Sequence, residues 1–197
     1  MLLAFVASVA AAWPWADRPS FADTEQSAAP SPPNEYTVKA VFLYSFGRYV
    51  EWPKAALGDD KAPFVIGVLG EDPFGGALDA IAAKKTIQDR RIVVRRFPTL
   101  EAYEKSKRTC HILFVSGAIP AEQQAAVIAK TDGKPVLVVG EAPGFSERGA
   151  TADFVLDGDR VQFEINVDAA RRAQLRMDAK LLRLGKPVGA PPAGTAN

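Results

Sequence analysis

Short apolar runs alternate with segments of helical spacing through the middle of the chain. Each run stands between glycine, proline or charged residues, as is typical of strands covered on both faces. Such strands are predicted at 64–69, 92–94, 110–115 and 136–139. Helices are predicted at 36–50, 77–83, 100–107 and 121–130. The alternation indicates a mostly parallel sheet with helices on both faces.

The first predicted helix begins at Tyr36 and is stopped by Pro53. Its apolar residues recur at steps of three and four, so one side of the helix is expected to pack against the sheet. That side is predicted to comprise Val38, Val41, Phe42, Ser45, Tyr49 and Val50.

The pattern changes in the C-terminal third. Apolar and polar residues alternate over 152–157 and 161–165 around the turn residues Asp157-Gly158, which predicts an antiparallel hairpin with one face in water. Asn166 is expected to cap a helix over 167–175, and a last short helix is expected at 180–184. The fold class is therefore α/β, a single three-layer domain over 35–186. Its sheet is mixed but mostly parallel, with helices on both faces and a C-terminal antiparallel hairpin.

Both ends of the chain are expected to lie outside this domain. Residues 1–22 resemble a signal peptide, because the apolar start is too short to span a membrane and small residues precede a cleavage site after Ala22. Residues 23–34 are rich in Pro, Ser and Ala and predict a flexible leader, and 187–197 predict a disordered tail. Export to the periplasm is therefore expected.

Composition excludes several classes of function. The chain has 197 residues with a formal net charge of +1, so it lacks the broad cationic field of sequence-independent nucleic-acid binding. Its single cysteine, Cys110, excludes an intrachain disulfide, and its single histidine, His111, excludes His-pair metal motifs. No metal, cofactor or nucleic-acid partner is expected.

Three residues of the 110–116 region could carry chemistry. Ser116 would be a nucleophile if a base reached it, but His111 stands five residues earlier, so strand alternation sends the two side chains to opposite faces. Ser116 is better explained as a turn residue and His111 as a hydrogen-bonded strand residue. Cys110 is interpreted as a small buried hydrophobic residue, with an intermolecular disulfide as the alternative. No catalytic residue is predicted.

The loop at 140–149 leaves the carboxyl end of a buried strand, where ligands bind in open α/β sheets. Gly140, Gly144 and Phe145 are therefore candidate binding residues, with an ordinary mobile surface loop as the alternative. The polar side of the last predicted strand adds Arg160 and Glu164, which a solvated strand face explains equally well.

Basic residues concentrate between 171 and 186. Arg171, Arg172 and Lys180 are candidates for binding a small anionic ligand or a partner near a membrane, because guanidinium groups match phosphate and carboxylate geometry. The alternative is a solvated helix face.

Several ordered stretches, taken together, resemble the YfiR family of periplasmic proteins from about Tyr36 to Leu184. They are Tyr-Thr-Val-Lys-Ala-Val-Phe-Leu at 36–43, Val-Glu-Trp-Pro at 50–53, Cys-His-Ile-Leu-Phe-Val-Ser at 110–116, Gly-Glu-Ala-Pro-Gly-Phe at 140–145, Arg-Val-Gln-Phe-Glu-Ile-Asn at 160–166, Ala-Ala-Arg-Arg-Ala at 169–173 and Lys-Leu-Leu-Arg-Leu at 180–184. Glu51 and Trp52, within the second stretch, join the candidate binding residues.

The resemblance implies a regulator without enzymatic activity, and a homodimer. Its expected partner is the periplasmic sensor domain of an inner-membrane diguanylate cyclase or sensor kinase, whose restraint lowers cyclic-di-GMP signalling and biofilm formation. The chain departs from the family at Met177-Asp178-Ala179 and Gly185, near the last helix. Some members depend on disulfides, which this chain cannot form internally. The alternative function is a periplasmic small-ligand binding protein that serves a receptor or a transporter.

Overall fold

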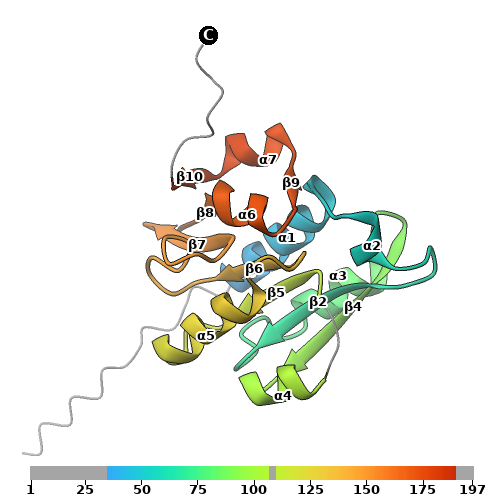
Figure 1. Ribbon diagram of the computed structural model, residues 1–197, viewed down its shortest axis with the longest axis horizontal. Coiled ribbons are helices and arrows are strands. Elements are labelled where there is room, and N and C mark those ends of the chain that lie inside the picture. The colour runs from blue at the N-terminus through green and yellow to red at the C-terminus, as the bar shows by residue number, and fades with distance from the viewer. Residues whose placement is uncertain (1–34, 107–109, 190–197) are drawn as a thin grey trace, which may run out of the picture. The chain divides into compact units, whose positions relative to one another are not determined.

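The computed structural model describes residues 35–106 and 110–189 (Figure 1). In chain order the elements are α1 (Glu35–Tyr49), β1 (Val50–Glu51), α2 (Lys54–Leu57), β2 (Phe64–Leu69), α3 (Ala77–Lys84), β3 (Thr86–Ile87), β4 (Arg90–Phe97), α4 (Leu100–Lys105), β5 (Ile112–Val115), α5 (Ala121–Thr131), β6 (Leu137–Gly140), β7 (Ala152–Asp157), β8 (Arg160–Asn166), α6 (Val167–Arg172), β9 (Arg176–Met177), α7 (Ala179–Leu184) and β10 (Lys186–Val188). The signal peptide and leader expected at 1–34 and the tail expected at 190–197 lie outside the described residues.

Eight strands form the main sheet in the order β10-β8-β7-β6-β5-β2-β4-β3. Strands β4, β2, β5, β6 and β7 are parallel neighbours, whereas β3 pairs antiparallel with β4, and β8 pairs antiparallel with β7. The chain forms β4 on one side of β2 and then crosses to form β5 on its other side. In open α/β sheets such a switch point is where ligands bind, beyond the carboxyl ends of the strands.

Successive side chains of the central strands enter two separate hydrophobic cores, because strand residues alternate between faces. Phe64, Ile66 and Val68 of β2 lie in one core with residues of α1 and α3. Val65 and Leu69 lie in the other with residues of α4 and α5. Helix α1 is thus on the opposite side of the sheet from α5 (Figure 1). The predicted three-layer α/β fold with its mixed sheet and C-terminal hairpin is confirmed.

The predicted inner side of helix α1 is only partly correct. Phe42 and Tyr49 pack against the core and Val50 is buried, but Val41 is 50% exposed, and Val38 and Ser45 are only half-buried. The buried side comprises Glu35, Lys39, Ala40, Leu43, Phe46 and Gly47. Apolar residues occur on all sides of this helix, so their spacing does not identify the side that is buried. The buried side also includes the Glu35–Lys39 ion pair. Gly47 lets the helix approach β3, because a side chain there would overlap Ile87.

Three further expectations need correction. Strand β7 has no continuous wet face, because Asp153 is completely buried under the 141–150 loop. The helix after Asn166 ends at Arg172 instead of continuing to 175, since Gln174 has φ +58° and starts a turn toward β9. The expected tail begins later than 187, because Pro187 and Val188 pair with β8 as part of β10.

Candidate functional site

A cavity of about 730 Å³ lies at the switch point of the sheet. The segments that follow β2, β5 and β6 meet there, together with the end of β7 and the first turns of α1. Its lining includes Glu35, Lys39, Glu71, Gly117, Glu141 and Leu156. A cavity of this size can hold a metabolite-sized ligand.

A buried ion network forms the floor of this switch-point cavity. The ammonium nitrogen of Lys39 lies 2.5 Å from Glu35 Oε1 and 2.7 Å from Glu141 Oε2, and the Lys39 side chain is only 5% exposed. Burial by itself would lower the pKa of Lys39, but hydrogen bonds with Glu141 and Glu35 outweigh it, so this pKa is raised. Lys39 is therefore a fixed positive charge held between two carboxylates.

Glu141 connects this network to the loop after β5. Its Oε1 accepts a hydrogen bond from Gly117 N at 3.1 Å, while its Oε2 accepts from Lys39. The next amide, Ala118 N, lies 3.4 Å from Ser116 Oγ. The carboxyl end of β5 therefore has two of its backbone donors engaged by side chains of the protein.

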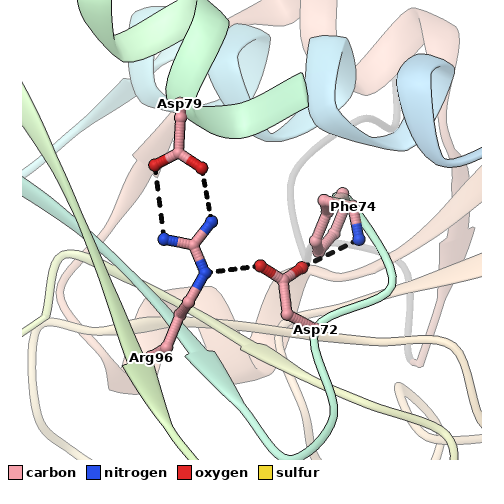
Figure 2. A network of polar contacts seen from close by, with 4 residues as sticks. All are labelled: Asp72, Phe74, Asp79 and Arg96. Atoms are coloured by element: carbon pink, nitrogen blue, oxygen red, sulfur yellow. Dashed lines mark hydrogen bonds and ion pairs between the residues drawn. The ribbon is translucent and has the colours of Figure 1, made fainter. Parts of the chain in front are cut away.

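Arg96 of β4 holds the segment between β2 and α3, which forms another wall of the cavity. Its guanidinium reaches Asp79 of α3 with bonds of 2.6 and 3.3 Å, and Asp72 at 2.6 Å, as Figure 2 shows. Asp72 also accepts a hydrogen bond from Phe74 N at 2.8 Å. The Phe74 ring packs edge-on against Phe114, with centroids 4.7 Å apart. These contacts fix the backbone that carries Glu71 and Pro73.

Two of the candidate residues in the 140–149 loop are packed inside the protein. Phe145 is fully buried, and its ring lies against Gly140, where any side chain would overlap it. Phe145 N donates a hydrogen bond of 2.9 Å to Asp153 Oδ2. Desolvation by burial raises the pKa of Asp153 to about 6. Gly140 and Phe145 thus position the loop from which Glu141 enters the cavity.

The other predicted residues of this region lie apart from the cavity. Gly144 is half-buried with φ +68°, and Arg160 is exposed on the hairpin. Glu164 accepts a hydrogen bond from Ser146 Oγ at 3.4 Å, behind the loop. None of the three is part of the lining.

The predicted basic residues form surface ion pairs or stand exposed. Arg171 pairs with Asp168 at 3.3 Å, and Arg172 pairs with Asp132 at 2.9 Å. Lys180 is exposed and has no ion pair among the residues that the structure describes. None of these cations lines the switch-point cavity. The structure therefore does not place the expected anion-binding residues at this cavity.

Glu51 and Trp52 are neighbours in sequence but differ in solvent exposure. Glu51 is exposed and lies 3.7 Å from Arg176, whereas Trp52 is 6% exposed and packs edge-on against Phe64. Trp52 Nε1 is buried without a hydrogen-bond partner in the described part of the chain. Trp52 therefore belongs to the core beside β2.

The 110–116 region has the roles expected from its sequence. His111 is buried: its Nδ1 accepts from Val65 N at 2.9 Å, and its Nε2 lies 3.1 Å from Ala56 O. Desolvation lowers the pKa of His111. Ser116 lies in the switch-point cavity, at the other end of β5 from His111. Cys110 is fully buried, and burial raises its pKa to about 12. Neither residue forms a nucleophile–base pair with Ser116 in this structure.

Replacing His111 is expected to reduce stability. His111→Phe keeps an aromatic ring over Phe64, which stacks on His111 at 4.5 Å, but leaves Val65 N and Ala56 O without their partners. We expect the free energy of unfolding to fall by about 1–3 kcal/mol, the cost of leaving the buried Val65 amide unsatisfied, with a smaller contribution from the half-buried Ala56 carbonyl. Urea denaturation near neutral pH measures it.

The pH dependence of the same variant provides a control. A folded-state pKa below the ordinary 6.5 means that the neutral ring is favoured, so its stabilisation is complete above 6.5 and is lost as pH falls below that value. The variant has no imidazole at this position, so its free energy of unfolding should not include the part of the decrease in acid that comes from protonation of His111. Equal stability of the two proteins at neutral pH would contradict the assigned hydrogen bonds.

The cavity charges were missed in the sequence, although one signal was present. Glu35 and Lys39 form a Glu-x-x-x-Lys pair at the start of a helix that is otherwise rich in apolar residues. Such pairs usually lie on solvated faces, so nothing marked this one as buried. Glu141 stands in the Gly-Glu-Ala-Pro-Gly-Phe stretch at 140–145, where nothing in the spacing indicates that its side chain faces a cavity.

Comparison with known proteins identifies a family for most of the chain. The sequence profile of the YfiR/HmsC-like family matches residues 36–186. No curated protein matches the chain. Among solved structures, an ABC domain in complex with L-Trp from Streptococcus pneumoniae is similar at 12% identity and a TM-score of 0.44. The similarity covers 64% of this chain and 55% of the other, so the chain spans about half the length of that structure.

Neither a membrane-spanning helix nor a metal-binding cluster is present among the described residues. No helix within 35–106 or 110–189 is long and apolar enough to cross a membrane. In the same part of the chain, no group of three or more His, Cys, Asp or Glu side chains could hold a metal ion.

Proposed function

We propose that this chain, which belongs to the YfiR/HmsC-like family, is a periplasmic regulator that restrains an inner-membrane diguanylate cyclase. It binds the periplasmic sensor domain of the cyclase, or of a related sensor kinase, and so lowers cyclic-di-GMP signalling and biofilm formation. The observation that carries this proposal is the family match over 36–186, which takes in nearly all the described residues. Regulation of this kind needs only two states of different partner affinity.

The surface of α7 and β10 supports a docking role. Leu184 is 69% exposed and Leu182 is 37% exposed. Exposed cations surround them at Lys180, Arg183 and Lys186. An apolar centre within a charged rim is typical of protein interfaces. We therefore assign the cyclase contact to this α7–β10 surface, with a second copy of the chain completing a homodimer elsewhere.

Cellular cyclic-di-GMP tests the proposal. Deleting the gene should raise cyclic-di-GMP and biofilm mass, and the wild-type chain should restore both. A chain with Arg183→Glu and Leu184→Asp should fail to restore them, since both side chains are exposed on the proposed interface. The matched control is Lys105→Glu, which changes an exposed cation on α4. Unchanged cyclic-di-GMP in the deletion strain would contradict the proposal.

A second candidate function is the binding of a small ligand on behalf of a receptor or transporter. The observation that favours it is the cavity at the switch point, where the lining combines charged and apolar side chains. The two functions are compatible, because a ligand could shift the affinity for the membrane partner.

A further inference from the structure

The switch-point cavity has an excess of negative charge. Among the described residues, three carboxylates line it, from Glu35, Glu71 and Glu141, against the single ammonium of Lys39. Glu71 is exposed and has no ion pair among the described residues. The Glu35 carboxylate, which contacts Lys39 through Oε1, also lines the cavity. Acceptors for an additional positive group are therefore present.

Two backbone donors that an anion could use are already engaged. At a switch point, anions usually bind to free backbone amides at the strand ends. Here Gly117 N donates to Glu141, and Ala118 N is near Ser116 Oγ. Lys39, the only cation among the described lining residues, is already held by two carboxylates. A carboxylate or phosphate entering the cavity would meet like charge and would find these three donors already engaged.

The remaining wall is apolar. Leu156 at the end of β7 is 54% exposed, and Pro73, Pro143 and Val155 also line the cavity. Phe154 and Val155, the two residues before Leu156 in β7, also line the cavity and continue this wall toward Lys39. A ligand that pairs with the carboxylates can thus place a hydrocarbon body against this side.

We infer that the cavity binds a small organic cation, a primary amine with an apolar body. The ammonium group donates to Glu71, in a cavity that the Glu35 and Glu141 carboxylates also line, and the body lies on Leu156 and the neighbouring prolines. This inference rests on the second candidate function and names its ligand class. It replaces the anionic ligand that the basic segment suggested.

Three probes of equal chain length test it: n-hexylamine, hexanoate and hexan-1-ol. Each is titrated into the purified ¹⁵N-labelled chain at neutral pH, and amide shifts are followed in two-dimensional NMR spectra. Hexylamine should shift the amides around Gly117 and Leu156 and bind at least about 10-fold more tightly than hexanoate. Hexanol, which keeps the body without charge, should bind between the two.

Two variants assign the selectivity to the cavity. Glu71→Gln should weaken hexylamine binding by up to about fivefold, the range of an exposed ion pair. Glu147→Gln, an exposed carboxylate outside the lining, should leave it unchanged. Equal affinity for amine and carboxylate, no shift with hexylamine, or no effect of Glu71→Gln would overturn the inference. Cyclic-di-GMP in cells is read separately, so a failure here leaves the cyclase proposal intact, and the reverse also holds.

Discussion

Replacing Lys39 by methionine should lower the free energy of unfolding by about 3–5 kcal/mol, the range measured when one member of a buried ion pair is removed. Methionine fills a similar volume, so the loss comes from charge. Glu35 and Glu141 would be left facing each other at the bottom of the cavity, without the ammonium that lies 2.5 and 2.7 Å from them. Chemical denaturation near neutral pH measures this loss.

The chain contains a matched control for this substitution. Lys105 pairs with Glu101 at 2.5 Å and with the same four-residue spacing on a helix, but these side chains are 75% and 72% exposed. Lys105→Met should therefore cost at most about 0.5 kcal/mol, as for other exposed helix pairs. The two variants share the residue type and the i,i+4 pair, so the difference between them reports what burial and the second carboxylate, Glu141, add at Lys39.

The carboxylates provide a second test. Adding Glu35→Gln and Glu141→Gln to Lys39→Met removes the uncompensated charge and should recover a large part of the lost stability, because neutral amides keep hydrogen-bonding capacity. Glu141→Gln also retains an oxygen to accept from Gly117 N. If Lys39→Met and Lys105→Met proved equally mild, the Lys39 network would not be the buried support of the cavity.

The central layers of the fold were predictable because their residues admit few alternatives. The runs at Phe64–Leu69 and Ile112–Val115 are continuously apolar, and each became a strand buried on both faces. Strands β1, β3 and β9 have two residues each, too few to produce a pattern. Pro187 suggested a tail, yet β10 is at the edge of the sheet, where a strand tolerates proline.

The candidate site was only partly predictable. The sequence indicated the end of the sheet at which the cavity lies, because a loop after a buried strand is at the carboxyl edge. It did not indicate which loop residues face the cavity: Glu141 does, whereas Phe145 turns inward against Gly140. That choice depends on Asp153, whose carboxylate accepts from Phe145 N across the loop. Contacts between residues that are not adjacent in sequence set the orientation of the loop side chains. The spacing of residue types along the chain does not predict such contacts.

Replacing Asp153 by asparagine should stabilise the protein at neutral pH. Asp153 is completely buried, and its pKa is raised from 3.8 to about 6, chiefly by desolvation and further by the nearby charge of Glu164. The folded state therefore favours the protonated acid. The charged form costs about 3 kcal/mol above pH 6, and this cost disappears as pH falls from about 6 to about 4.

Asparagine avoids that cost and keeps the local geometry. Its oxygen can still accept from Phe145 N, whereas its amide nitrogen takes the place of Oδ1, which is buried without a partner among the described residues, and leaves N–H donors unsatisfied there. We expect Asp153→Asn to be more stable than wild type by about 1–2 kcal/mol at neutral pH, because the unsatisfied N–H donors offset part of the gain, and the advantage should be absent near pH 4. Urea denaturation over this pH range measures the difference between the two proteins.

Asp157→Asn provides the control on the same strand, because Asp157 is exposed and hydrogen-bonds Gln162 at 2.7 Å. Its effect should be within about 0.5 kcal/mol, as for other surface substitutions. A constant difference between Asp153→Asn and wild type from acid to neutral pH would show that Asp153 does not titrate with a raised pKa. A stability difference that grows from pH 4 to pH 6 would show that the desolvated carboxylate of Asp153 is the source of the cost. Asp153 lies under the 140–149 loop, which carries Glu141 into the cavity.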